Sequence, residues 1–199
     1  MKQLVTKAVF VTLGIILAIC MLISTIFFIF FPLSLARLFE NLGSYSASMY
    51  FYQKQYENTN SIEDLYVLCT KVDIYNDEQD ATQYFSDMIS KKEYQTFCIS
   101  KDVNGYGIST EEMIEGKYIV AQYNANGLSS ALELGSNLTN DEYSENNPFR
   151  MLITDRKLNF SKAQLQQVKD AIEKLSVSSE DKVNLDNDLT YLNGKINNL

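Results

Sequence analysis

The sequence predicts an all-α protein, with a single N-terminal transmembrane helix followed by stacked helical hairpins. Three observations predict this fold: a long apolar run near the N-terminus, apolar residues at helical spacing beyond it, and capping residues in front of several of these stretches. The predicted parts are a cytoplasmic N-terminus (1–7), a transmembrane helix (8–31), helical hairpins (32–99), an irregular middle segment with short helices (100–160) and a C-terminal helical hairpin (161–199).

The apolar run from Ala8 to Phe31 has 24 residues without a charge or a proline. At about 1.5 Å per residue, a helix of this length crosses a hydrocarbon core of about 30 Å. A cleaved signal peptide is one alternative, but its apolar region usually has only about 7–15 residues. A lipoprotein signal ending at Cys20 is another, but Ile19 stands where that signal has a small residue. We therefore expect an uncleaved signal anchor.

The charges that flank this run predict the orientation of the chain. Lys2 and Lys7 precede the run, whereas Arg37 and Glu40 follow it. Positively charged flanks stay on the cytoplasmic side of a membrane. We expect a single-pass membrane protein with a cytoplasmic N-terminus and an extracytoplasmic C-terminal domain, so the lipid bilayer is its first partner.

The rest of the chain is strongly acidic. From residue 33 onward there are 15 basic and 25 acidic residues, a formal charge of −10. A field of this sign repels phosphates, which argues against nucleic-acid binding and against docking of the domain on anionic lipid headgroups. We expect no nucleic-acid partner.

The sequence also argues against most enzymes. It has no histidine, which excludes Ser-His and Cys-His nucleophile systems and most catalytic zinc sites. It has no phosphate-binding glycine motif and no G-x-S-x-G motif. We therefore predict no catalytic residue, no cofactor and no enzymatic activity.

Cys69 and Cys98 are the possible disulfide pair. Inert buried thiols are the alternative, because both residues lie in apolar surroundings.

Two segments of residues 32–99 resemble each other. Ala47-Ser-Met-Tyr-Phe51 recurs as Ala81-Thr-Gln-Tyr-Phe85, 34 residues later. With Leu65, Leu68 and Cys69, the second copy resembles a tetratricopeptide repeat, whose small residues let paired helices approach closely. The resemblance covers about 65 residues and implies a short α-solenoid. The pattern departs from the family at Val72, Met88 and Glu93, and a generic helical hairpin is the alternative.

Capping residues and turn signals divide the chain further. Asn41 to Ser44 predicts the end of one helix and the start of the next, and Thr96 to Ile99 predicts a short strand or a loop. Asn140 to Pro148 predicts a polar loop. Four capping pairs predict helix starts: Ser61 with Asp64, Ser109 with Glu112, Ser161 with Gln164, and Ser178 with Asp181.

One segment is similar to a calcium-binding loop. Asp102, Asn104 and Glu112 lie near the ligand positions of an EF-hand. The segment is one residue short, and Tyr106 occupies a slot that should carry a ligand oxygen. A turn that leads into a capped helix explains the same residues, so we predict no metal site.

A tyrosine stripe is the candidate partner-binding feature. Tyr45, Tyr52 and Tyr56 share one face of a predicted helix. Three interpretations are open: packing inside the domain, a belt at the membrane interface, or a groove for a partner.

These observations predict a non-catalytic protein–protein interaction module or accessory subunit at the cell envelope, with another membrane or envelope protein as its partner. The anchor would confine the module to two dimensions and so raise its effective concentration. One alternative is an extracytoplasmic sensory or ligand-binding domain that signals through one helix. A second is a carboxylate-dependent hydrolase, which would need convergent, desolvated acids in a cleft.

Overall fold

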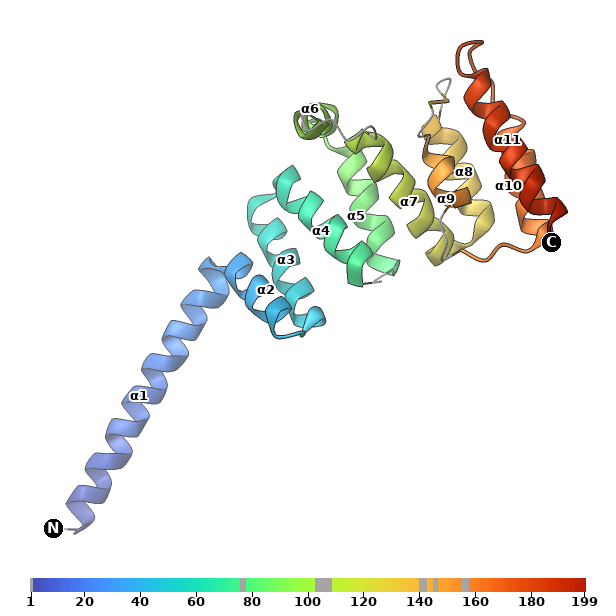
Figure 1. The fold of residues 1–199 in the computed structure, drawn as a ribbon. Coiled ribbons are helices and arrows are strands. Elements are labelled where there is room, and N and C mark those ends of the chain that lie inside the picture. Colours follow the sequence, from blue (N-terminus) through green and yellow to red (C-terminus); the bar gives the residue numbers. More distant parts are fainter. Residues whose placement is uncertain (1, 76–77, 103–108, 140–142, 145–146, 155–157) are drawn as a thin grey trace. The chain divides into compact units, whose positions relative to one another are not determined.

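The structure, a computed structural model, describes residues 2–75, 78–102, 109–139, 143–144, 147–154 and 158–199. Helices account for 83% of the chain, and the described residues form no strand, which confirms the all-α prediction. Its helices (Figure 1) are α1 (Lys2–Phe30), α2 (Pro32–Asn41), α3 (Tyr45–Thr59), α4 (Ile62–Tyr75), α5 (Glu78–Ser90), α6 (Tyr94–Lys101), α7 (Thr110–Asn126), α8 (Leu128–Thr139), α9 (Pro148–Thr154), α10 (Lys162–Ile172) and α11 (Lys182–Asn197).

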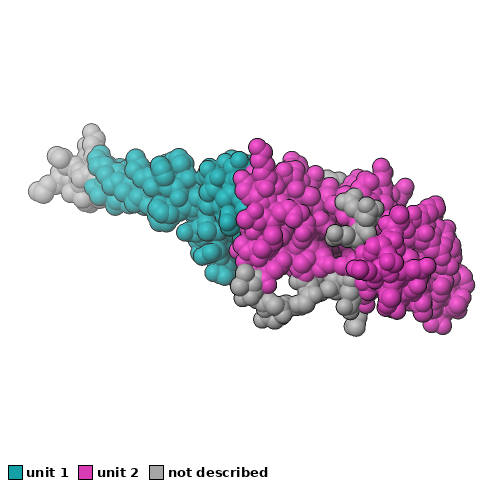
Figure 2. Space-filling model, turned by 90° about the horizontal axis from the view of Figure 1, so that it is seen from above, with its two compact units in different colours: residues 1–68 teal, residues 69–199 magenta. Residues whose placement is uncertain are grey.

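The chain divides into two compact units, coloured teal and magenta in Figure 2. The first comprises residues 1–68 and the second residues 69–199. The boundary falls within α4.

Helix α1 is long and apolar enough to cross a membrane. The stretch from Phe10 to Phe30 has 21 residues with a mean hydropathy of 2.8, and none of it is buried. The helix ends where Pro32 follows, because a proline ring clashes with the preceding turn and has no N–H to donate. Pro32 instead occupies the first turn of α2, where its missing N–H has no partner to lose.

Helices α2 and α3 form an antiparallel hairpin in the first unit. Gly43, whose φ is +72°, makes the turn between them in a conformation that favours glycine. The Ser48 hydroxyl donates to the Ala36 carbonyl at 2.9 Å, and the Tyr52 hydroxyl donates to Glu40 Oε2 at 2.7 Å. The predicted stop and restart at residues 41–44 is therefore confirmed.

Helix α4 starts at its predicted cap. Ser61 Oγ accepts a hydrogen bond from the backbone N–H of Asp64 at 3.1 Å. Asp64 Oδ2 in turn accepts from the hydroxyl of Thr59 at 2.6 Å, which closes the turn after α3. Because the cap satisfies an N–H group that the helix itself leaves without a partner, it fixes where α4 begins.

An extensive apolar core lies in the second unit, among α7 to α11. Helices α8 and α9 approach closely, and Gly135 allows this, because a Cβ atom there would lie 2.6 Å from Phe149 Cζ. The fully or nearly buried members of this core are Ile119, Leu128, Ala131, Tyr143, Phe149, Leu152, Ile153, Leu165, Val168, Ile172, Leu185, Leu192 and Ile196. Its last six members come from α10 and α11, which form the predicted C-terminal hairpin.

A buried aspartate joins the segment before α9 to α11. Asp188 Oδ2 accepts hydrogen bonds from the Tyr143 hydroxyl at 3.0 Å and from Asn147 Nδ2 at 3.2 Å. Arg150 Nη1 lies 3.9 Å from Asp188 Oδ1. Burial, and then the Asp188 charge, raise the pKa of Tyr143, so this phenol stays protonated and donates. These bonds fix the position of the segment that enters α9.

Two local predictions were wrong, and one helix was missed. The segment 96–99 is neither strand nor loop but part of α6, because Tyr94, Phe97 and Cys98 are buried on one helical face. The loop expected from Asn140 to Pro148 is confirmed at the described residues 143, 144 and 147, but Pro148 already begins α9, which was not predicted; residues 140–142 and 145–146 lie outside the described part. Ser178 Oγ does accept from the backbone N–H of Asp181, at 3.2 Å, but α11 begins only after Asp181.

Candidate functional site

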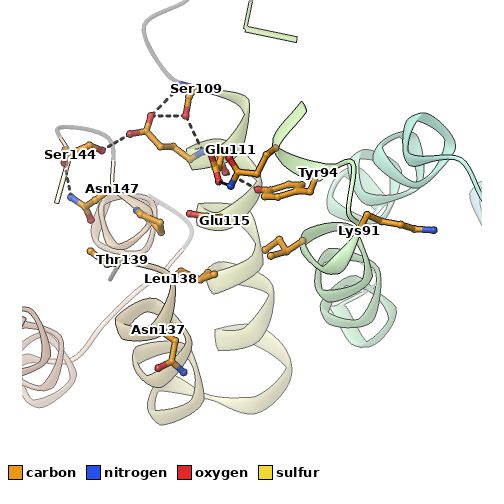
Figure 3. Close-up of a pocket in the computed structure, with 14 residues that line it drawn as sticks. Lys91, Tyr94, Ser109, Glu111, Glu115, Asn137, Leu138, Thr139, Ser144 and Asn147 are labelled. Atoms are coloured by element: carbon orange, nitrogen blue, oxygen red, sulfur yellow. Dashed lines mark hydrogen bonds between the residues drawn. The ribbon is translucent and has the colours of Figure 1, made fainter. Parts of the chain in front are cut away.

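A cleft of about 800 Å³ in the second unit is the candidate site. Five parts of the chain surround it: the end of α5 with the turn after it, the start of α6, the start of α7, the end of α8 and the segment before α9 (Figure 3). Its lining residues are Ile89, Lys91, Tyr94, Gln95, Ser109, Glu111, Glu112, Glu115, Asn137, Leu138, Thr139, Ser144, Asn147 and Pro148.

The N-terminus of α7 forms one wall of the cleft. Ser109 Oγ accepts from the Glu112 N–H at 3.1 Å, while Glu112 Oε2 accepts from the Ser109 N–H at 3.1 Å. This capping box confirms the predicted start of α7. Glu112 Oε1 also accepts from the Ser144 hydroxyl, so the same carboxylate joins the helix start to the opposite wall (Figure 3).

Glu111 connects α7 to α6 at the rim. Its Oε1 accepts from Gln95 Nε2 at 2.6 Å. The Tyr94 hydroxyl points toward the Glu111 backbone carbonyl at 3.5 Å (Figure 3). Burial, and then the Cys98 sulfur and nearby acids, raise the pKa of Tyr94, so its hydroxyl is a neutral donor at the edge of the cleft.

Glu115 lies one turn further along α7, and its side chain is partly buried. Burial is the largest cause of a rise in its pKa, and the charges of Glu111 and Glu112 add to it; together they raise the pKa to about 7. Near neutral pH this carboxyl is therefore protonated in about half of the molecules, so it can donate or accept a hydrogen bond.

The arrangement favours a positively charged or hydrogen-bonding guest over an anion. Three carboxyl groups, those of Glu111, Glu112 and Glu115, line the cleft, whereas the side chain of Lys91, the basic residue among its lining residues, points away from it (Figure 3). A cation placed among these carboxyl groups would lower the pKa of Glu115. The carboxyl group would then lose its proton, and its negative charge would attract the cation. Within the described ranges, no three side chains of the metal-binding types converge, so the geometry gives no support to a metal centre.

The calcium-loop residues occupy other roles in the structure. Asp102 Oδ1 accepts from the Thr110 N–H at 2.6 Å at the start of α7, and Glu112 belongs to the capping box. Asn104 lies outside the described residues. Both described carboxylates thus stabilise a helix N-terminus, which an acidic group favours through its hydrogen bonds and its charge.

The three stripe tyrosines have different surroundings. Tyr52 is buried and donates its hydroxyl to Glu40. Tyr56 is half-buried, whereas Tyr45, at the start of α3, exposes about half of its surface. Tyr52 therefore belongs to the interior of the hairpin, and Tyr45 is the most exposed of the three.

The three cysteines form no disulfide. Cys69 and Cys98 are both buried, and burial raises the pKa of each thiol to about 12. Thiols in this state are neutral and unreactive at physiological pH, as the interpretation of inert buried thiols requires.

Several cleft residues were not predicted. Glu115, Tyr94 and Asn147 come from different parts of the chain, and none belongs to a motif. One feature of the sequence could have indicated this site: Glu111, Glu112 and Glu115 lie close together on one predicted helix. Like charges at this spacing destabilise a helix unless another contact offsets their repulsion.

No protein-family model, curated protein or solved structure matches the chain.

Proposed function

We propose that this protein is a single-pass membrane protein whose helical domain binds a partner protein in the cleft and carries out no chemistry itself. The anchor would hold the cleft beside the membrane, where even weak binding of a neighbouring membrane protein becomes effective. The orientation that we propose has the N-terminus in the cytoplasm, because Lys2 and Lys7 precede the span.

The exposure of α1 is the observation that carries this proposal. Its large apolar side chains, from Phe10 to Phe30, each leave 42–71% of their surface uncovered. Burying one such side chain gains about 1.5–3 kcal/mol, so moving fifteen half-covered side chains from water into an apolar medium would gain on the order of 20 kcal/mol. A lipid bilayer around α1 would supply this gain.

The charge of the cleft supports a basic partner. A flexible segment rich in Lys or Arg would neutralise Glu111, Glu112 and Glu115, and the acidic field of the domain would attract it. Glu115 would lose its proton when such a segment binds, so binding should strengthen as the pH rises through about 7.

A tetratricopeptide-like arrangement of residues 32–99 is part of the proposal. The small and aromatic positions of the suspected repeat, Cys69, Ala81 and Phe85, are all buried, which close packing of paired helices requires. Leu65 and Leu68 are buried as well.

Cysteine labelling in intact cells tests the anchor and its orientation. A membrane-impermeant maleimide should label Asn197→Cys in intact cells, and should label Gln3→Cys only after permeabilisation. The wild-type chain gives the background from its own three cysteines. The reverse pattern would overturn the orientation, and recovery of the uncleaved chain as a soluble monomer would overturn the anchor.

Substitution in the cleft tests the binding site. Full-length protein should be recovered with a defined membrane partner in mild detergent, and Asn137→Arg, which adds a cation to the cleft wall, should reduce that recovery. Asn124→Arg is the matched control, because Asn124 is also exposed on a helix of the second unit but does not line the cleft. Equal loss in both variants, or in neither, would exclude the cleft as the site.

A ligand-binding sensory domain is the second candidate function, and the size of the cleft favours it. Its volume of about 800 Å³ falls within the range of small-molecule sites, about 300–1,000 Å³. A small cationic ligand that raises the Tm of the full-length protein in detergent, with Asn137→Arg abolishing the shift, would support this function. A hydrolase has less support, because Glu111 and Glu112 already accept hydrogen bonds from Gln95, Ser109 and Ser144.

A further inference from the structure

The hairpin of α2 and α3 has features of a surface that lies in the membrane interface. We propose that Leu38, Leu42 and Tyr45, here called the interfacial patch, insert among the lipid headgroups and upper acyl chains beside the anchor. The inference rests on the proposed anchoring of α1, and it adds a second lipid contact that fixes the depth of the anchor. It makes the bilayer, not another protein, the partner of this patch.

The first argument is that the hairpin packs on the end of the span itself. The Phe51 ring of α3 lies 5.0 Å, centroid to centroid, from Phe28, which belongs to the last turn of the Phe10–Phe30 stretch. On its other side Phe51 stacks on Phe39 of α2 at 5.5 Å. A buried ring of the hairpin therefore lies level with residues of the span, so the hairpin cannot lie far above the bilayer surface.

The second argument is the absence of a linker. Phe31 alone separates α1 from α2, and the chain turns sharply away from the α1 axis at Pro32 (Figure 1). The proposal therefore places α2 along the membrane surface. Helices of this kind bury their apolar side about 5–10 Å into the boundary between headgroups and acyl chains.

The third argument is the pattern of exposure on α2. Pro32 and Ala36 are buried in the hairpin, and Ser34, Arg37 and Asn41 form an exposed polar strip. Between these two faces lies Leu38, which exposes 51% of its surface. Leu42, just past the end of α2, exposes 69%, and Tyr45, the first residue of α3, exposes 52%. This division into buried, apolar and polar strips suits a helix at a water–lipid boundary.

The fourth argument is the distribution of charge. Residues 31–59 carry Arg37, Lys54, Glu40 and Glu57, for a net charge of 0, and Lys54 forms an ion pair with Glu57. Residues 60–199 carry 13 basic and 23 acidic residues, a net charge of −10. Anionic headgroups repel the acidic part but not residues 31–59, and Arg37 can reach a lipid phosphate from the polar strip. The part of the chain that adjoins the membrane therefore has a net charge close to zero.

Single tryptophans can test the proposal, because the chain has none of its own. We would compare three full-length variants in nanodiscs of phosphatidylcholine and phosphatidylglycerol, with and without bromine in the upper acyl chains. Leu42→Trp reports on the interfacial patch. Phe27→Trp reports on the anchor. Asn58→Trp is the aqueous control, at an exposed position near the opposite end of α3.

The expected result is that brominated lipid quenches Phe27→Trp and Leu42→Trp but leaves Asn58→Trp unchanged, and that Leu42→Trp emission shifts to the blue in lipid. If Phe27→Trp is quenched while Leu42→Trp behaves like Asn58→Trp, the interfacial patch faces water and this proposal fails, with the anchor intact. If Leu42→Trp is blue-shifted but not quenched, a protein covers the patch and the proposal also fails. If Phe27→Trp is not quenched, the anchor fails and the interfacial patch with it.

Discussion

The replacement Glu115→Gln measures how much the charge of this partly buried carboxyl group lowers the free energy of unfolding. Gln has nearly the same shape as Glu and resembles its protonated form, so the variant removes the charge without removing the side chain. Because burial raises the pKa of Glu115 in the folded protein, the native state holds its proton to a higher pH than the unfolded chain does. The wild-type protein should therefore lose stability as the pH rises from about 4.5 to about 7, and no further above that.

The size of the effect follows from the shift of the pKa, from 4.5 to about 7. Each pKa unit corresponds to about 1.36 kcal/mol, which would give about 3 kcal/mol for a carboxyl group fully removed from water. Glu115 is only partly buried, and solvent screening reduces this to about 1–2 kcal/mol. Glu115→Gln should thus be more stable than the wild type by this amount at pH 8, and nearly equal to it at pH 4.5.

Urea unfolding of the full-length protein in detergent micelles, followed by circular dichroism between pH 4.5 and 8, measures this difference. Glu133→Gln is the matched control, because Glu133 is an exposed carboxyl on α8 of the same unit. Its stability relative to the wild type should change little with pH. A Glu115→Gln difference that stays constant over the same range would show that Glu115 is not desolvated, and the description of the cleft would be wrong.

Three further predictions concern packing and reactivity. Asp188→Ala should lower the free energy of unfolding by about 2–3 kcal/mol in urea titrations, because two buried donors lose their acceptor. Gly135→Ala should lower the free energy of unfolding by about 1–3 kcal/mol, because its new Cβ would overlap a phenylalanine ring of α9. Gly194→Ala is the control: it has open space around it, so it should be neutral or should raise the free energy of unfolding by up to about 1 kcal/mol. Cys69 and Cys98, with thiol pKa values of about 12, should stay unmodified by maleimide in native protein and react in urea, as peptide mass spectrometry would show; rapid native labelling would contradict their burial.

Local features of the sequence predicted most of the helices. The all-α class followed from apolar residues at helical spacing, and the starts of α4, α7 and α10 from the capping pairs led by Ser61, Ser109 and Ser161. These predictions succeeded because a cap and its helix lie within a few residues of each other, so the interacting groups are adjacent in the sequence.

The failures came where contacts between distant residues decided the outcome. Residues 96–99 were expected to form a strand or a loop, yet they are part of α6, because Tyr94, Phe97 and Cys98 form a buried face of this helix. The start of α9 was missed because its first residues follow a polar stretch. Tyr143 and Asn147 in that stretch are buried and donate hydrogen bonds to Asp188, which lies more than 40 positions further along the sequence.

The sequence by itself determined the apolar span, the helical class and the acidic charge, because each depends on which residues are neighbours along the chain. Only the tertiary structure decided that Glu115 is desolvated, that the cleft exists, and that Leu38 and Leu42 stay exposed beside the end of α1. The physical reason is that the solvation of a side chain depends on the segments that fold against it, and residues far apart in the sequence supply those segments.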